Sequence, residues 1–200
     1  MTVNGGATLA VEWLSRREGE RPIVAQLFGV LETPARNALF RAAVAERRYF
    51  VEASTGGADG HRHAQVHYSC VEEAEPLVDL VQELGPSLAG PLGVHLDEVR
   101  RVERQLTVHH AGGFYRPHRD DQGEEASRRA LTYVYYFHGR RRWRGGELAF
   151  SGEPGLVVEP TDNSLVVFAA SLEHEVRPVV AETALAFEDG RFTLNGWLWR

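Results

Sequence analysis

The sequence predicts a mainly β protein with N-terminal helices, an α+β chain, on three observations. Two segments before residue 90 repeat apolar residues at helical spacing, whereas residues 99–200 consist of short β-rich runs separated by Gly, Pro, Asp and Asn. With 200 residues, 43% apolar and 25% charged, the chain suits one globular domain with a real core. We therefore expect a single domain over residues 1–200, in which 1–98 are mainly helical support plus first strands and 99–200 form the β core.

Two helices are expected in the N-terminal part. Residues 32–48 ("ETPARNALFRAAVAERR") have Thr33 as a candidate N-cap, Pro34 at the first helical position and apolar residues along one side. Residues 72–90 ("EEAEPLVDLVQELGPSLAG") repeat Leu and Val at helical spacing. Both helices should therefore lay an apolar stripe on a neighbouring layer, which we expect to be a sheet.

Short β-rich runs dominate the chain from residue 99 onward. They are "VERQLTVHH", "LTYVYYF", "GELAF", "GLVVEP", "SLVVFAA", "HEVRPVV" and "RFTLNGWLW". Short strands with turn signals at such intervals indicate a sandwich, a barrel or a jelly roll. In contrast, residues 54–63 ("STGGADGHRH") are typical of a Gly-rich loop.

Composition excludes several classes of function. The net charge of -6 disfavours nucleic-acid binding, which depends on basic surface. No apolar stretch reaches the roughly eighteen residues of a membrane span, and the first residues lack the pattern of a secretion signal. Cys70 is the only cysteine, so we expect a reducing cytoplasm and no all-thiolate metal site.

The Arg-rich segment 139–146 ("GRRRWRGG") is the local exception to the acidic balance. Arg140, Arg141, Arg142 and Arg144 surround Trp143, and they could cradle an acidic or aromatic partner. Charged runs usually face water, so a solvated loop between two strands is the competing interpretation.

The stretch "YRPHRDD" (residues 115–121) contains a candidate metal-binding pair. On a strand, side chains two residues apart share a face, so His118 and Asp120 would converge while their neighbours point away. His174 follows an apolar strand and a short turn, and it is the candidate third ligand. Two histidines and a carboxylate make the facial triad of non-haem Fe(II) oxygenases. Arg191 and Thr193 share a face of the last strand and suit a carboxylate of a dicarboxylic co-substrate.

Other polar residues offer alternatives to this triad. His61, His63 and His67 form a second candidate cluster, for zinc or nickel, although they fall next to the Gly-rich loop without a helix to fix their spacing. Asp121 would replace Asp120 if the strand register slipped by one residue, because that shift turns it to the other face.

These motifs resemble those of the Fe(II)- and 2-oxoglutarate-dependent oxygenases, in the prolyl 4-hydroxylase-like branch. Five blocks occur in order over about residues 99–199: "GGFYRPHRD", "RRALTYVYYFH", "WRGGELAF", "VVEPTDNSLVVFAASLEHEVRPV" and "GRFTLNGWLW". The resemblance implies a double-stranded β-helix (jelly roll) core with supporting helices, and a metal site at its open end.

The resemblance also implies roles for individual residues. His118, Asp120 and His174 match the iron ligands, and Arg191 matches the basic residue that holds the distal carboxylate of 2-oxoglutarate. Tyr136 matches a tyrosine that bonds the same carboxylate, with Thr132 and Val134 on its face of the strand. Candidate substrate contacts are Tyr115, Arg129 and Trp197. The chain departs from the family in two places: His109 stands where a pocket tyrosine is common, and the gap from His174 to Arg191 is long, with residues 181–189 expected to form an inserted hairpin tip.

The chemistry implied is oxidative decarboxylation of 2-oxoglutarate coupled to hydroxylation of an aliphatic C–H. The cofactors expected are Fe(II), 2-oxoglutarate as co-substrate and O2, with ascorbate as a candidate reductant. Halogenating relatives lack the carboxylate ligand, so Asp120 favours hydroxylation. A peptide, a protein or a small amino-acid-like molecule all fit as substrate, because specificity depends on loops over the open end. No nucleic-acid or membrane partner is expected.

Two further classes of function stay open. One is a cupin-type metal enzyme that does not use 2-oxoglutarate, and the other is a jelly-roll module that only binds a ligand. Arg191 with Thr193 favours the oxygenase, because a cupin has no need of a clamp for a distal carboxylate. If the clamp is misaligned by the long gap, Arg177 is the next basic residue to consider.

Overall fold

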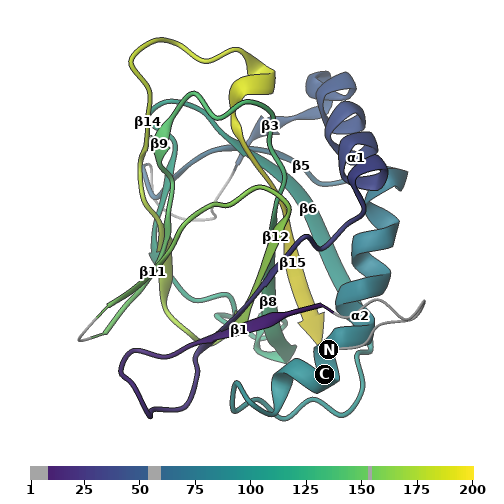
Figure 1. Cartoon of the computed structure of the whole chain (residues 1–200), viewed down its shortest axis with the longest axis vertical. Helices are drawn as coiled ribbons and strands as arrows, with labels where there is room; N and C mark the ends of the chain where they lie inside the picture. Colours follow the sequence, from purple (N-terminus) through teal and green to yellow (C-terminus); the bar gives the residue numbers. More distant parts are fainter. Residues whose placement is uncertain (1–8, 54–59, 153–154) are drawn as a thin grey trace.

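The computed structural model describes residues 9–53, 60–152 and 155–200, which form two facing sheets with two helices on one side (Figure 1). The larger sheet has the order β1 (Val11–Leu14), β2 (Val24–Phe28), β12 (Ser164–Ala169), β8 (Arg129–Tyr136), β15 (Arg191–Trp199), β6 (Arg101–His109), β5 (Gln65–His67) and β3 (Val51–Glu52). The smaller sheet has the order β11 (Leu156–Val158), β10 (Leu148–Phe150), β13 (His174–Val176), β7 (Phe114–His118) and β4 (Arg62–His63). A short pair, β9 (Arg144–Gly145) and β14 (Val179–Val180), lies beside them. This is the double-stranded β-helix that the sequence predicts.

Three long antiparallel strands, β6, β15 and β8, form the centre of the larger sheet. Their side chains alternate between two buried faces, as the period of a strand requires. On β8, Tyr133 and Tyr135 join the core under the helices, whereas Val134 and Tyr136 join a second core between the sheets. The central strands are therefore covered on both sides.

Helices α1 (Thr33–Ala45) and α2 (Glu75–Ala89) cover the outer face of the larger sheet, as expected (Figure 1). Leu77, Val81 and Leu84 of α2 pack into the same core as Leu198 of β15. The N-cap of α1 is Glu32 rather than Thr33, because Thr33 is already the first helical residue. No side-chain hydrogen bond caps this end of the helix. No helix in the described part of the chain combines the length and the apolar composition that a membrane span requires.

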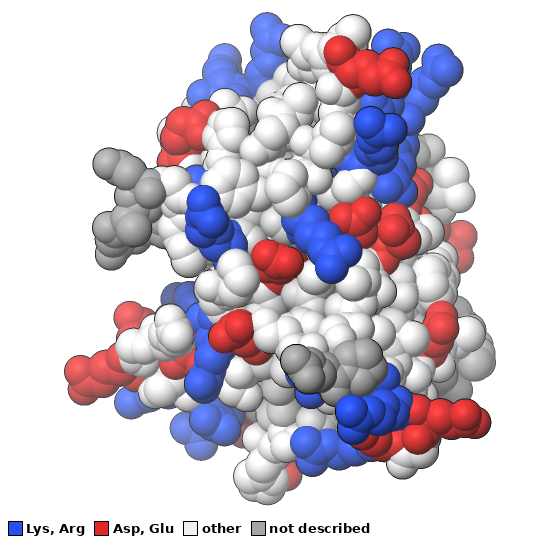
Figure 2. Space-filling view, turned by 90° about the vertical axis from the view of Figure 1, so that its left-hand side faces the viewer, with Lys and Arg blue, Asp and Glu red and all other residues white. Residues whose placement is uncertain are grey.

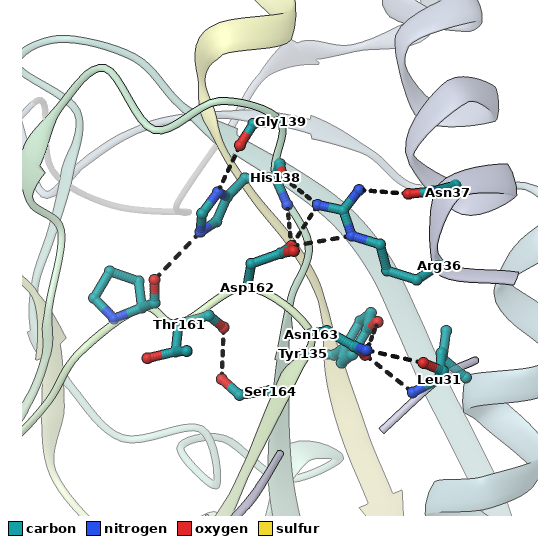
Figure 3. Close-up of polar contacts among 11 residues, drawn as sticks. Leu31, Arg36, Asn37, Tyr135, His138, Gly139, Thr161, Asp162, Asn163 and Ser164 are labelled. Atoms are coloured by element: carbon teal, nitrogen blue, oxygen red, sulfur yellow. Dashed lines mark hydrogen bonds and ion pairs between the residues drawn. The ribbon is translucent and has the colours of Figure 1, made fainter. Parts of the chain in front are cut away.

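A polar network fixes α1 to the turn before β12 (Figure 3). The Arg36 side chain bonds the Asp162 carboxylate, with Nε 3.1 Å from Oδ1, and it also donates to the carbonyl oxygen of His138. Asn163 has a left-handed backbone (φ 55°), and its side-chain amide bonds both backbone groups of Leu31. These contacts explain how a helix on the outer face holds the end of β8 in place.

The N-terminal part contains β1 to β5 as well as the helices, and β1 and β2 extend the larger sheet. One expectation about local structure needs correction. Residues 181–189 are not a hairpin tip, because β14 and β15 do not pair; the segment instead crosses from the β9–β14 pair to the larger sheet. It ends in a 3-10 turn (Phe187–Asp189) whose Phe187 ring packs against Phe50 and Phe192.

Gly196 gives a test of the close strand packing on β15. A Cβ at Gly196 would lie 1.8 Å from the backbone oxygen of Glu103, which also accepts a bond from the Tyr133 hydroxyl. Gly196→Ala should therefore lower the free energy of unfolding by about 1–3 kcal/mol. The matched control is Gly90→Ala, where a Cβ meets nothing within 4 Å and the backbone is helical, so no loss is expected. Chemical denaturation measures both, and equal stabilities would contradict this packing.

Candidate active site

A cavity of about 950 Å³ opens between the two sheets. Its floor is the inner face of β6, β8 and β15, and its opposite wall comes from β4, β7 and β13. The floor is unusually polar for a surface that lies inside the molecule. Its buried polar side chains are Gln105, Thr107, His109, Thr132, Arg191 and Thr193. Such a lining suits a polar ligand rather than an apolar core.

His118, Asp120 and His174 meet on the wall of this cavity. His118 ends β7 and His174 begins β13, and the two residues are direct cross-strand partners. One ligand atom of each of the three residues lies within 4.8 Å of the other two. The Nε2 atoms of His118 and His174 lie 3.6 and 3.5 Å from the Asp120 carboxylate oxygens. Within the described ranges, this is the one group of three such residues able to hold a metal.

Asp120 reaches this group by a different route from the one the strand pattern suggested. Strand β7 ends at His118, so Asp120 lies in the turn that follows rather than two residues along the same strand. Its backbone N–H donates to the carbonyl oxygen of Ala170 at 3.0 Å, which ties this turn to the end of β12. The neighbouring Asp121 turns away and bonds Arg119.

Hydrogen bonds orient all three side chains. The Nδ1 atoms of His118 and His174 lie 2.8 and 2.9 Å from the carbonyl oxygens of Arg116 and Leu172. Because a carbonyl only accepts, each Nδ1 must carry the proton, which leaves Nε2 with a free lone pair toward Asp120. The Thr132 hydroxyl donates to Asp120 Oδ2 at 2.7 Å.

The electrostatics favour a neutral His118. Burial, followed by the nearby His174, lowers the pKa of His118 from its ordinary value to about 4. The imidazole is thus uncharged at neutral pH, which is the state in which it can ligate a metal.

Arg191 lies in the same cavity and is 1% exposed. Its Nε donates to the carbonyl oxygen of Gly146 at 2.7 Å, and its Nη atoms make long contacts to His109 Nδ1 (3.4 Å) and the Tyr136 hydroxyl (3.5 Å). Burial lowers the pKa of the guanidinium, and no carboxylate lies within 4 Å among the described residues. A fully buried cation whose side-chain contacts within hydrogen-bonding distance are all neutral is costly unless a ligand supplies the negative charge. The expected alternative, Arg177, is exposed on its side chain and near Glu175.

His109 adds an unpaired donor beside Arg191. Its Nδ1 faces a guanidinium N–H and must accept, so Nε2 carries the proton, yet Nε2 is buried without a partner in the described chain. Burial, helped by the charge of Arg191, lowers the pKa of His109 and keeps the ring neutral. Thr193 is also buried here, but its hydroxyl donates to Asn195 Oδ1 at 3.3 Å.

The three candidate substrate contacts also line the cavity. The Tyr115 ring stacks on His118, with centroids 3.5 Å apart. Arg129 lies over the Trp197 ring at 3.6 Å and is paired with Glu103 at 2.7 Å. Arg62, Thr107 and Asn195 also line the cavity, and sequence patterns did not single them out. Alternation along β6 and β15 is a signal that could have found Thr107 and Asn195, whereas the two-residue strand β4 gives no such signal for Arg62.

The other sequence candidates do not form sites. His61 packs against Tyr115, His63 contacts the carbonyl oxygen of Gly112, and His67 bonds Glu46 on the far side of the sheet. In the Arg-rich segment, Arg141 pairs with Glu159 and Arg142 with Asp189. Figure 2 shows positive and negative side chains interspersed on one face of the molecule rather than one continuous basic patch.

A jelly roll with two histidines and an aspartate gathered in its cavity, beside a buried arginine, defines a class of non-haem oxygenases. The model of the 2OG-Fe(II) oxygenase superfamily matches residues 104–199. The chain belongs to this superfamily.

Individual relatives agree with this assignment. The chain is 32% identical over 169 residues to an uncharacterized PKHD-type hydroxylase of Synechocystis sp., a match that covers 76% of this chain and 55% of that protein. The chain thus spans about half the length of this curated relative. A prolyl-4-hydroxylase of Pseudomonas putida has a similar structure, with a TM-score of 0.67 and 23% identity over 88% of this chain and 92% of that one. A Trichoplax adhaerens prolyl hydroxylase, solved with a peptide fragment of a hypoxia-inducible factor, gives a TM-score of 0.70 and 17% identity over 88% and 83%.

Thr132 should control metal affinity through Asp120. Thr132→Val keeps the shape of the side chain but removes the hydrogen bond to Asp120 Oδ2, so the carboxylate loses its fixed orientation. We expect Mn(II) or Fe(II) to bind roughly 10-fold more weakly, in line with other hydrogen-bonded ligands. Metal titration measures this without turnover. The matched control is Thr161→Val on the exposed turn before β12, which should bind metal normally; an unchanged affinity in Thr132→Val would mean that this bond does not orient Asp120.

Proposed function

We propose that this chain is an Fe(II)- and 2-oxoglutarate-dependent dioxygenase that hydroxylates an aliphatic C–H, in the manner of a prolyl hydroxylase, on a peptide, a protein or an amino-acid-like substrate. The observation that carries the proposal is one cavity that holds both the His118, Asp120 and His174 cluster and the unpaired Arg191. Family membership and the prolyl hydroxylase-like fold support it.

The donor set fits ferrous iron. Two imidazole nitrogens and one carboxylate oxygen make the facial triad, in which three protein ligands leave the remaining coordination positions free. His118 and His174 would each bind through Nε2, because both Nδ1 atoms donate to carbonyl oxygens. Asp120 would bind through Oδ1, because Thr132 already donates to Oδ2.

The pocket around Arg191 fits the distal carboxylate of 2-oxoglutarate. The guanidinium provides the missing counter-charge, and the Tyr136 hydroxyl and the His109 Nε2–H supply further donors. Thr193 would join them by turning its hydroxyl from Asn195 to the ligand. Charge-assisted bonds from a planar guanidinium are the strongest contacts a carboxylate can make in such a site.

The protein's own contribution is binding, orientation and exclusion of water. When bound, iron supplies activation of O2 with electrons from 2-oxoglutarate, which leaves succinate and carbon dioxide while the substrate C–H becomes C–OH. Tyr115 covers His118 on the cavity side and would orient the target carbon. Trp197, with its Nε1–H unpaired, and Arg129 would bind polar atoms of the substrate.

We also propose that residues 1–200 act as one domain, since the helices pack on the sheet that forms the cavity floor, and that Cys70, a buried free thiol, suits a cytoplasmic location.

Two other functions are less well supported by the geometry. A cupin-type enzyme without 2-oxoglutarate leaves the buried charge of Arg191 without a purpose, and so does a module that only binds a ligand through its surface. The pairing of Arg141 and Arg142 with acidic residues supports the solvated interpretation of the Arg-rich segment over a role in binding an acidic substrate.

Succinate release from 2-oxoglutarate in the presence of Fe(II) and O2 tests this function. His118→Ala, Asp120→Ala and His174→Ala should each abolish it, while the protein still unfolds in one cooperative transition, because the larger core lies on the helix side of the sheet. His174→Ala should also melt at a lower temperature than the parent, because the His174 ring packs against Phe168 of the second core. The amount of succinate, with and without ascorbate, is the measurement. Retained turnover in His174→Ala would remove that residue from the metal site.

Arg191 should determine co-substrate affinity without affecting iron. Arg191→Met removes the partner of a desolvated carboxylate and should weaken 2-oxoglutarate binding by on the order of 2–5 kcal/mol. The visible absorption of the anaerobic Fe(II) complex reports this affinity, and metal titration reports iron. The matched control is Arg177→Met, which should bind 2-oxoglutarate like the parent. Arg177 directly follows β13 and its side chain is exposed. If both variants bind it equally well, the carboxylate does not lie at Arg191.

A further inference from the structure

Arg62 is a second cation in the cavity, and its position is fixed by strand pairing. Strand β4 pairs with β7, and Arg62 lies directly opposite Tyr115. Cross-strand partners share one face of a sheet, so the Arg62 guanidinium lies over the Tyr115 ring, 4.9 Å from its centroid. Tyr115 stacks in turn on His118. A continuous series of ring contacts therefore leads from Arg62 to the proposed iron ligand.

Arg62 lacks an acidic partner among the described residues. Its Nε is buried without a hydrogen bond, and its Nη2 donates only to the neutral Thr107 hydroxyl, at 3.3 Å. Apart from Arg191, the other arginines around the cavity are paired, including Arg129 with Glu103, Arg119 with Asp121, and Arg104 with Glu75. Burial lowers the pKa of Arg62 from its ordinary value, and the charge of the nearby Asp120 carboxylate only partly opposes this effect.

Two hydrogen-bonded side chains, Thr107 and Asn195, lie between Arg62 and the pocket proposed for 2-oxoglutarate. The Thr107 hydroxyl donates to Asn195 Oδ1 at 2.8 Å, and the same oxygen accepts from Thr193. Arg62, on the wall, thus contacts Thr107 at one end of a polar row on the floor, and Thr193, two residues from Arg191 on β15, lies at the other end. Its charge also acts on His118, although less strongly than burial and His174 do. Arg62 therefore adjoins the metal cluster from the substrate side, next to Tyr115.

We infer that Arg62 binds a carboxylate of the substrate, so that the substrate class is a molecule with a carboxylate near the hydroxylated carbon. The inference rests on the proposed function and specifies its substrate. An arginine fork binds a carboxylate through two parallel hydrogen bonds, and a partly buried guanidinium without a salt-bridge partner gains from such a ligand. The carboxylate comes from a free amino acid or from an acidic residue of a peptide, and the same chemistry recognises both.

A matched pair of probes tests the subsite directly. Cyclopentanecarboxylate and cyclopentanecarboxamide have the same ring, but only the first is charged. With protein loaded with Mn(II) and saturating 2-oxoglutarate, ligand-observed NMR should detect the carboxylate and not the amide. The signal should fall at least tenfold in Arg62→Met, remain in part in Arg62→Lys, and be unchanged in Arg177→Met. Equal signals for both probes, no signal for either, or an undiminished signal in Arg62→Met would overturn the inference.

Stability separates binding from a structural role. If Arg62 is held without a salt-bridge partner for a ligand, Arg62→Met removes a partly buried charge and keeps the apolar stem, so the unloaded variant should melt at the parent temperature or above. A clear fall in melting temperature would show that Arg62 instead supports Tyr115, and it would overturn the inference. The visible absorption of the Fe(II) complex with 2-oxoglutarate should be the same in Arg62→Met and the parent. Loss of this absorption in the parent itself would be a failure of the proposed function, not of the subsite.

Succinate release identifies the source of the carboxylate. Free L-amino acids and their primary amides form one arm, and blocked peptides with and without an acidic residue beside proline form the other. Stimulation by free amino acids but not by amides supports a small substrate, and stimulation only by acidic peptides supports a peptide substrate. In either case Arg62→Met should remove the difference between charged and neutral probes; stimulation that does not depend on the carboxylate would contradict its role.

Discussion

The strict alternation of side chains on β6, β8 and β15 is the constraint on which the rest of the structure depends. One face of these strands must match the apolar surfaces of α1 and α2, and Tyr133, Leu194 and Leu106 do so. The other face can then be polar without exposing the core, and it carries Thr132, Thr193 and Thr107 into the cavity. A single shift of register in any of these strands would exchange the two sets, burying polar groups under the helices. The fold and the site are therefore specified by the same pairing.

The same arrangement places charged side chains in the cavity, and their desolvation lowers the stability of the fold. Arg191 is buried and Arg62 is half-buried, each without a salt-bridge partner in the described chain, and Asp120 lies between the imidazoles of His118 and His174. Such groups destabilise the empty fold, and the large apolar core on the helix side offsets them. The benefit is preorganisation, because donors that already point at a ligand's charge need not reorganise when it binds.

Sequence patterns predict the parts of this protein in which period and chemistry coincide. The long strands, both helices and the residues His118, Asp120 and His174 were identifiable because apolar alternation and ligand types occur together there. The sequence did not show that Asp120 lies in the turn after β7 rather than on the strand itself. Both arrangements bring the Asp120 carboxylate close to His118, so the residue pattern cannot distinguish them. The expectation of a hairpin at residues 181–189 was wrong. This segment is a crossover held by the packing of Phe187 on Phe192, and a single aromatic contact leaves no periodic pattern in the sequence. Arg62 was missed for a related reason: β4 has only two residues, and nothing local shows which strand it joins.

The position of β4 places a second arginine, Arg62, in a different part of the cavity from Arg191. A strand of two residues contributes little stability, yet its pairing with β7 is what brings a cation to Tyr115 and hence close to His118. Arg191, in contrast, begins β15, which is one of the two nine-residue strands of the floor, and its Nε donates to the carbonyl oxygen of Gly146. Two carboxylates can therefore be held in one cavity without exchanging places, because each guanidinium has different fixed neighbours. One lies beside Tyr136 and His109, and the other beside an aromatic ring that covers the metal cluster. Under the proposed function, the co-substrate would bind at an arginine on a long central strand, and the substrate carboxylate at an arginine on a two-residue edge strand.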